Sequence, residues 1–193
     1  MQVTAIILTG GKSSRMGTDK ALLELGEETL LSRAVCLCSK VCNEILIGSD
    51  SEEHRINPHQ LVADELKDCG PIGGIYSCLK QSTNELNFVL SVDAPFVTTG
   101  FIKNIVSQSK GFDAVVPVHS GKREPLIALY NKNILNDMKE QLDSGNYKMQ
   151  FFLNRINTNW VDADEWLKNT PDLFHNLNFP EDIDKGAPQT GRK

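Results

Sequence analysis

The chain has 193 residues, 40% hydrophobic and 23% charged, with a net charge of −5 and a pI near 5.4. At roughly 150 residues per domain this length suits one domain, and the composition excludes collagen-like, low-complexity and wholly disordered chains. Since nucleic-acid binders carry an overall positive field, we expect no nucleic-acid partner, and any polyanion bound must be small.

Short runs rich in β-branched residues predict strands, and the segments between them have helical periodicity. Apolar residues at three- and four-residue intervals predict a crossover helix over residues 28–42. Thr98 or Thr99 is suited to cap a second helix, and Gly145 is suited to end a third that starts near Ile134. The expected strands cover residues 3–8, 44–48, 87–92, 114–118 and 124–130.

This alternation predicts an α/β fold, a three-layer α/β/α sandwich around a mostly parallel, doubly wound, Rossmann-like sheet. Ligands of such sheets bind beyond the carboxyl ends of the strands. We expect a single domain over residues 1–184 and a flexible polar tail over residues 185–193. No long apolar stretch or basic leader is visible, so we expect a cytoplasmic protein without a membrane partner.

The segment that follows the first strand, LTGGKSSRMGTDK over residues 8–20, is the most informative. Gly10 and Gly11 allow a sharp turn and leave backbone amides open to phosphate oxygens. Arg15 and Lys20 are two of the three cations in this short loop, and both suit phosphate. The Walker and dinucleotide-binding patterns fail on glycine spacing. A Gly-rich surface turn with solvated charges explains the same residues about as well.

Two aspartates stand where strands are expected to end. Asp93 follows the apolar run over residues 88–92 and precedes a proline, which places it at the ligand-binding edge. A lone carboxylate of this kind suits Mg²⁺, although a turn or cap aspartate is an equally good explanation. Asp64 precedes a glycine-rich turn over residues 70–74 that should open a helix, whose first amides could meet phosphate or ribose.

Taken together, these segments resemble the nucleotidyltransferases with a glycosyltransferase-A-like fold, and most closely the molybdenum cofactor guanylyltransferases. The resemblance runs in family order from residue 8 to about residue 182 and so covers nearly the whole chain. The first motif is highly specific and the others are individually weak. The matching residues are Leu8-Thr9-Gly10-Gly11, Ser13, Arg15-Met16-Gly17, Asp19-Lys20, Gly70-Pro71-Ile72-Gly73-Gly74, Val92-Asp93-Ala94-Pro95, Pro125-Leu126 and Asn176-Leu177-Asn178.

The resemblance implies transfer of the GMP part of GTP to the terminal phosphate of molybdenum-bound molybdopterin, with release of pyrophosphate. It implies catalytic roles for Arg15, Lys20 and Asp93, with Asp93 holding Mg²⁺, and contacts to the acceptor from Asn176 and Asn178. The implied nucleotide-binding residues are Leu8, Thr9, Gly10, Gly11, Lys20, Asp64 and Asp93.

Two departures and several alternatives accompany this resemblance. Thr9 replaces the commoner alanine, and Gly48 stands where some relatives have asparagine. Relatives that are cytidylyltransferases or sugar-phosphate nucleotidyltransferases usually carry alanine at the place of Gly10, where the missing Cβ leaves room for a larger base. A non-catalytic cofactor-binding chaperone is the alternative from another class. The expected partners are GTP, molybdopterin and a molybdoenzyme or cofactor-handling protein.

Overall fold

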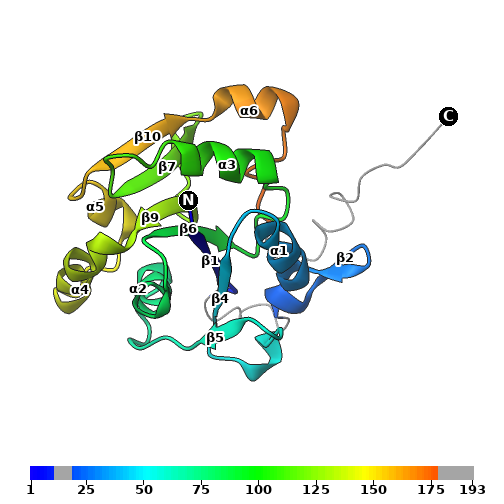
Figure 1. Cartoon of the computed structure of the whole chain (residues 1–193), viewed down its shortest axis with the longest axis horizontal. Coiled ribbons are helices and arrows are strands. Elements are labelled where there is room, and N and C mark those ends of the chain that lie inside the picture. Colours follow the sequence, from blue (N-terminus) through cyan, green and yellow to red (C-terminus); the bar gives the residue numbers. More distant parts are fainter. Residues whose placement is uncertain (11–18, 178–193) are drawn as a thin grey trace.

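The computed structural model describes residues 1–10 and 19–177 (Figure 1). The residues expected to form the tail, 185–193, lie outside this part of the chain. Within the described ranges, no helix combines the length and the apolar character needed to cross a membrane. The helices are α1 (Leu30–Ser39), α2 (Pro71–Gln81), α3 (Thr99–Ser107), α4 (Leu135–Asp143), α5 (Met149–Leu153) and α6 (Asp164–Asn169), with short 3-10 turns η2 (Lys20–Leu22), η3 (Glu52–His54) and η4 (Lys132–Ile134).

The main sheet has eight strands, seven of them in the order β10-β7-β9-β6-β1-β4-β5, with β8 paired to β7. Strand β9 runs antiparallel to both of its neighbours, and the other neighbours along this order are parallel. The strands are β1 (Val3–Leu8), β4 (Glu44–Gly48), β5 (Gln60–Val62), β6 (Leu86–Ser91), β7 (Ala114–His119), β8 (Lys122–Arg123), β9 (Ile127–Asn131) and β10 (Thr158–Asp162). A separate small sheet pairs β2 (Glu24–Leu25) with β3 (Glu28–Thr29).

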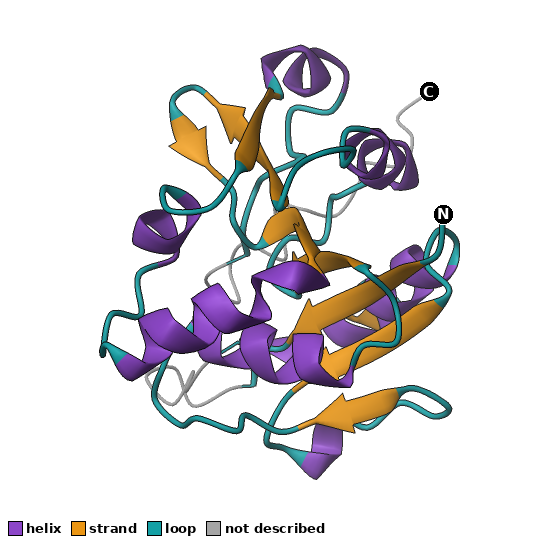
Figure 2. Ribbon diagram, turned by 60° about the vertical axis from the view of Figure 1, so that its left-hand side comes forward, coloured by secondary structure: helices purple, strands orange, loops and turns teal. Residues whose placement is uncertain are grey.

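Helices cover both faces of this sheet, which confirms the expected three-layer α/β/α sandwich (Figure 2). Along β1, Ala5 and Ile7 pack in one core cluster with α1 and α3. The alternate residues Ile6 and Leu8 pack in the other cluster with α2 and α4. All six residues of β1 are buried, as expected for a central parallel strand that is covered on both faces.

The ends of the strands and of helix α1 show which local interactions set the boundaries of these elements. Strands β1 and β4 have the expected bounds, whereas β9 begins at Ile127 and not at residue 124. Pro125 has no N–H to donate, so regular pairing starts after it. Helix α1 is shorter than the expected 28–42 and ends at Ser39. It starts at Leu30 because the Thr29 hydroxyl accepts a hydrogen bond from the backbone N–H of Ser32 at 3.1 Å and so caps the helix there.

The caps of the later helices agree with the sequence. Gly145 has a φ of 74° and donates its N–H to the carbonyl of Leu142 at 3.0 Å, which ends α4 as expected. For α3 the sequence allowed two caps, and the structure selects Thr98, whose hydroxyl accepts from the N–H of Phe101 at 3.2 Å. Thr99 is the first residue of the helix itself.

This cap gives a direct test of the boundary. We expect Thr98→Ala to lower the free energy of unfolding by about 1 kcal/mol, because an amide of the first turn of α3 loses its acceptor. The matched control is Thr99→Ala, which removes the same groups one residue later and is expected to cost less than about 0.5 kcal/mol. Urea unfolding of both variants measures the difference, and equal losses would contradict the assigned cap.

Candidate functional site

A cavity of about 690 Å³ lies beyond the carboxyl ends of β1, β4, β5 and β6. This is the edge of a doubly wound sheet at which ligands are expected. Its volume is within the range of small-molecule sites. The lining residues are Leu8, Thr9, Gly10, Asp19, Gly48, Ser49, Asp50, Ser51, His54, Asp64, Lys67, Asp68, Gly70, Pro71, Gly74, Ser91 and Leu126.

Four of the residues expected to bind the nucleotide line this cavity together: Leu8, Thr9, Gly10 and Asp64. The Thr9 hydroxyl donates to the carbonyl of Gly48 at 3.2 Å, so its extra polar group is satisfied within the protein. Gly10 has a φ of +97°, and a Cβ there would meet no described atom within 4 Å. The backbone conformation is therefore a reason for glycine at this position in addition to the room expected from the sequence.

The remaining expected residues lie beside the cavity or outside the described chain. Lys20 follows Asp19, which lines the cavity, and Asp93 lies two residues beyond Ser91, which also lines it. Neither Lys20 nor Asp93 is among the described lining residues. The positions Gly11, Arg15 and Asn178 lie outside the described residues.

The chain end that was expected to contact the acceptor runs past Asp93. The backbone N–H of Leu177 donates to the carbonyl of Asp93 at 2.8 Å. Asn176, next to Leu177, is exposed. Residues 176 and 177 therefore lie next to the turn that follows β6, although they are distant from it in the sequence.

Asp93 itself is half-buried in this turn, and its carboxylate makes no hydrogen bond or ion pair to another described residue. No group of three or more His, Cys, Asp or Glu side chains that could hold a metal occurs among residues 1–10 and 19–177. The carboxylate of Asp93 has the chemistry to supply the one protein oxygen of a Mg²⁺ ion that fills its other positions with water and substrate phosphates.

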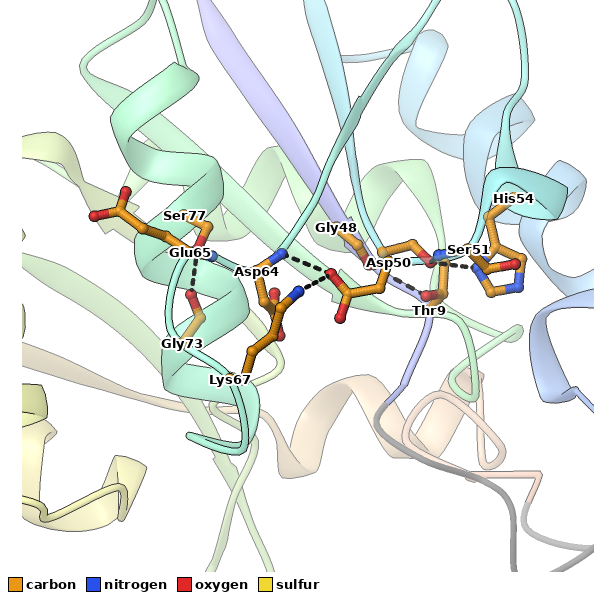
Figure 3. A network of polar contacts seen from close by, with 11 residues as sticks. Thr9, Gly48, Asp50, Ser51, His54, Asp64, Glu65, Lys67, Gly73 and Ser77 are labelled. Atoms are coloured by element: carbon orange, nitrogen blue, oxygen red, sulfur yellow. Dashed lines mark hydrogen bonds and ion pairs between the residues drawn. The ribbon is translucent and has the colours of Figure 1, made fainter.

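Asp50 and Lys67, which were not among the residues expected from the sequence, form a polar network with Asp64 (Figure 3). One carboxylate oxygen of Asp50 accepts from the backbone N–H of Asp64 at 3.0 Å and from the Lys67 ammonium at 2.5 Å. The Lys67 hydrogen bond holds the pKa of Asp50 below its ordinary value. Asp50 follows the end of β4 as Asp93 follows β6, and this shared position was a signal available in the sequence.

Burial raises the pKa of Asp64 above its ordinary value, and the neighbouring charge of Asp50 adds to this effect. Helix α2 approaches closely here, because a Cβ on Gly74 would lie 3.3 Å from Asp64 Oδ1. Gly70, at the N-terminus of α2, also lines the cavity and has a φ of 65°. The cavity therefore combines carboxylates with the positive end of a helix dipole.

These shifts predict opposite effects of two isosteric substitutions. The folded protein binds the Asp64 proton more tightly than the unfolded chain does, so ionised Asp64 lowers stability above the ordinary value of 3.8. We expect Asp64→Asn to raise the Tm at pH 7, by no more than the roughly 2–4 °C that 1 kcal/mol represents in a chain of this size. This gain should shrink as the pH falls towards 3.8.

The matched control is Asp50→Asn, because ionised Asp50 is stabilised in the folded protein and contributes stability above pH 3.8. This substitution should lower the Tm at pH 7, and its effect should persist down to about pH 4 and fade only below pH 3.8. Thermal unfolding of both variants between pH 7 and pH 4 measures these shifts. A gain for Asp64→Asn that is the same at every pH would contradict the assigned cause.

Comparison with known proteins places this chain in a family. The family described as "MobA-like NTP transferase domain" matches residues 5–159. A probable molybdenum cofactor guanylyltransferase of Natranaerobius thermophilus is 34% identical, over 98% of this chain and 97% of the relative. Its counterpart in Pelotomaculum thermopropionicum is 32% identical, over 96% and 92% of the two chains.

The fold has solved counterparts as well. The crystal structure of molybdopterin-guanine dinucleotide biosynthesis protein A from Archaeoglobus fulgidus superimposes with a TM-score of 0.80, over 95% of this chain and 96% of the other, at 22% identity. That likeness confirms the fold, and the family match over most of the chain adds the relationship in sequence. The chain belongs to the MobA-like NTP transferases, the family that its opening glycine-rich motif predicts.

Proposed function

We propose that this nucleotidyltransferase transfers the GMP part of GTP to the terminal phosphate of molybdenum-bound molybdopterin and releases pyrophosphate. The observation that carries the proposal is the cavity at the carboxyl ends of β1 and β4, which is lined by Leu8, Thr9, Gly10 and Asp19 of the first motif. Support comes from relatives named molybdenum cofactor guanylyltransferase that match nearly the whole chain. The cytoplasm expected from the sequence is the proposed location.

The chemistry demands positive charge in this cavity. The attacking phosphate oxygen and the α-phosphate are both anionic, and pyrophosphate leaves with further negative charge. Lys20 is the proposed contact to the triphosphate, and Arg15 is the second proposed cation. Since a phosphate nucleophile is largely deprotonated near neutral pH, the reaction needs no general base.

Mg²⁺ is the proposed metal, and Asp93 is the proposed ligand. The half-buried carboxylate, without a partner among the described residues, provides the one anionic oxygen such a site needs. When bound, the ion would neutralise phosphate charge in the transition state. Asn176, beside the same turn, and Asn178 are the proposed contacts to the molybdopterin acceptor. A molybdoenzyme or cofactor-handling protein is the proposed recipient of the product.

Asp64 provides the argument for guanine over cytosine. Guanine presents two adjacent donors, its ring N–H and its amino group, and one carboxylate can accept from both. Asp64 lines the cavity, and its carboxylate makes no hydrogen bond to another described residue. Cytosine has one amino donor beside two acceptors, so a carboxylate matches its edge less well.

The base preference is tested by measuring pyrophosphate release with each of the four NTPs, with and without molybdenum-bound molybdopterin. We expect release with GTP only when the acceptor is present, and a kcat/KM for GTP at least about tenfold above that for CTP, which corresponds to about 1.4 kcal/mol. A preference for CTP, or release with a sugar phosphate as acceptor, would replace the guanylyltransferase assignment. No release under any of these conditions would support the non-catalytic chaperone.

The role of Asp93 is tested by Asp93→Asn, which keeps the shape of the side chain and removes its charge. We expect turnover to fall by about 10²-fold or more, because a transition-state charge loses its counterpart. The matched control is Asp113→Asn, a change at a half-buried aspartate before β7, away from the cavity. Unchanged activity of Asp93→Asn at saturating Mg²⁺ would remove this residue from the mechanism.

A further inference from the structure

His54 is buried at the edge of the cavity, with 4% of its surface exposed, and both of its ring nitrogens have partners. Its Nδ1 lies 2.6 Å from the hydroxyl oxygen of Ser49, and its Nε2 lies 2.8 Å from Oδ2 of Asp19. Ser49 and His54 belong to the connection between β4 and β5, Asp19 precedes η2, and all three residues line the cavity. Figure 3 shows His54 beside Ser51.

The hydrogen bonds in this group run in one direction. The backbone N–H of Ser51 donates to the Ser49 hydroxyl oxygen at 3.1 Å, so the hydroxyl proton of Ser49 can go to Nδ1 of His54. The neutral ring then carries its proton on Nε2 and donates it to Asp19. Every member is satisfied, and such chains of hydrogen bonds strengthen one another in a buried environment.

Asp19 uses its two carboxylate oxygens for two different tasks. Oδ1 accepts from the backbone N–H of Ala21 at 3.0 Å and caps η2, the turn that begins with Lys20. Oδ2 is held by His54. The orientation of the cap, and with it the position of Lys20, therefore depends on a histidine 35 residues beyond Asp19 in the chain.

Ser49 anchors the other end. Its backbone N–H donates to the carbonyl of Val62, the last residue of β5, at 2.9 Å. Ser49 itself directly follows β4. His54 thus connects the rigid edge of the sheet to the segment that carries Lys20. We propose that His54 is a positioning residue, which acts through Asp19 to hold Lys20 in place for the phosphates of the nucleotide. This inference rests on the proposed function of Lys20.

Two substitutions at the same position separate the two hydrogen bonds of His54. A glutamine side chain places its amide near the Nε2 position of histidine, where it can still donate to Asp19. An asparagine side chain reaches only the Nδ1 position, where it can contact Ser49 and not Asp19. His54→Asn removes one methylene more than His54→Gln, and only His54→Asn breaks the link through Asp19 to Lys20.

Steady-state kinetics of the full chain with GTP and the molybdopterin acceptor provide the first readout. We expect His54→Asn to lower kcat and raise the KM for GTP, each by about tenfold. A displaced Lys20 would contact the phosphates less well in both the ground state and the transition state. The KM for the acceptor should not change. His54→Gln should stay within about threefold of the unaltered protein. A purely structural role would lower the active fraction and the Tm without changing the KM for GTP.

A double-mutant cycle tests whether His54 acts through Lys20. In a Lys20→Ala background, His54→Asn should add no further loss of kcat/KM, since the group it positions is already absent. Independent, multiplying losses would overturn the proposal, as would equal kinetics of the Asn and Gln variants. If both variants fail to fold, Asp19→Ser provides the same test, because serine keeps the cap of η2 and is too short to reach His54.

Limited trypsin digestion distinguishes failure of this inference from failure of the proposed function, since it needs no nucleotide. Cleavage of the Lys20–Ala21 bond, followed by mass spectrometry, reports how often η2 opens. We expect this bond to be cut several-fold faster in His54→Asn than in His54→Gln or the unaltered protein. Faster cleavage without any change in nucleotide use would overturn the role in binding. Unchanged cleavage would overturn the positioning itself.

Discussion

The parallel pairing of β1 with β4 on one side and β6 on the other is the constraint on which the site depends. The three strands end almost together, with Leu8 opposite Gly48 and Ser91. A Cβ on Gly48 would lie 3.0 Å from Leu8 Cδ2 and 3.2 Å from Cys78 Sγ. Glycine at position 48 therefore reflects the packing of the cavity floor, and a side chain there would displace Leu8. The cavity owes its shape to this close packing.

The sequence predicted the layers and the central strands because their signal is local. Fully apolar runs such as Val3–Leu8 are buried on both faces, and no other environment suits them in a chain of this composition. The short edge strand β10 carries mixed residues and escaped prediction, whereas β5 was expected only through the position of Asp64 after it. The reversed direction of β9 also escaped, because composition does not state which way a strand runs; the connection and its neighbours decide that.

The site was partly predictable for the same reason. Leu8, Thr9, Gly10 and Asp64 adjoin strand ends, and position at a strand end is visible in the sequence. The link between Asp19 and His54 joins residues 35 positions apart through a 3-10 turn. No periodicity marks such a contact, and a lone histidine in a polar loop has no signature of its own. Its role emerges only from the contacts of both ring nitrogens.

An acidic protein that binds a polyanionic substrate must keep its own carboxylates from repelling that substrate. In this cavity, the carboxylates of two aspartates are bound by groups of the protein itself. Asp19 is bound to His54 and to the start of η2, and Asp50 is bound to Lys67. Asp64, whose pKa is raised by burial, lies at the end of β5, whereas Asp93 follows β6 on the other side of β1. Three strand spacings, about 14 Å, separate these two ends. The proposed nucleotide would thus place its base near Asp64 and its phosphates towards Asp93 and Lys20, so that a carboxylate faces donors at one end and cations balance phosphate at the other.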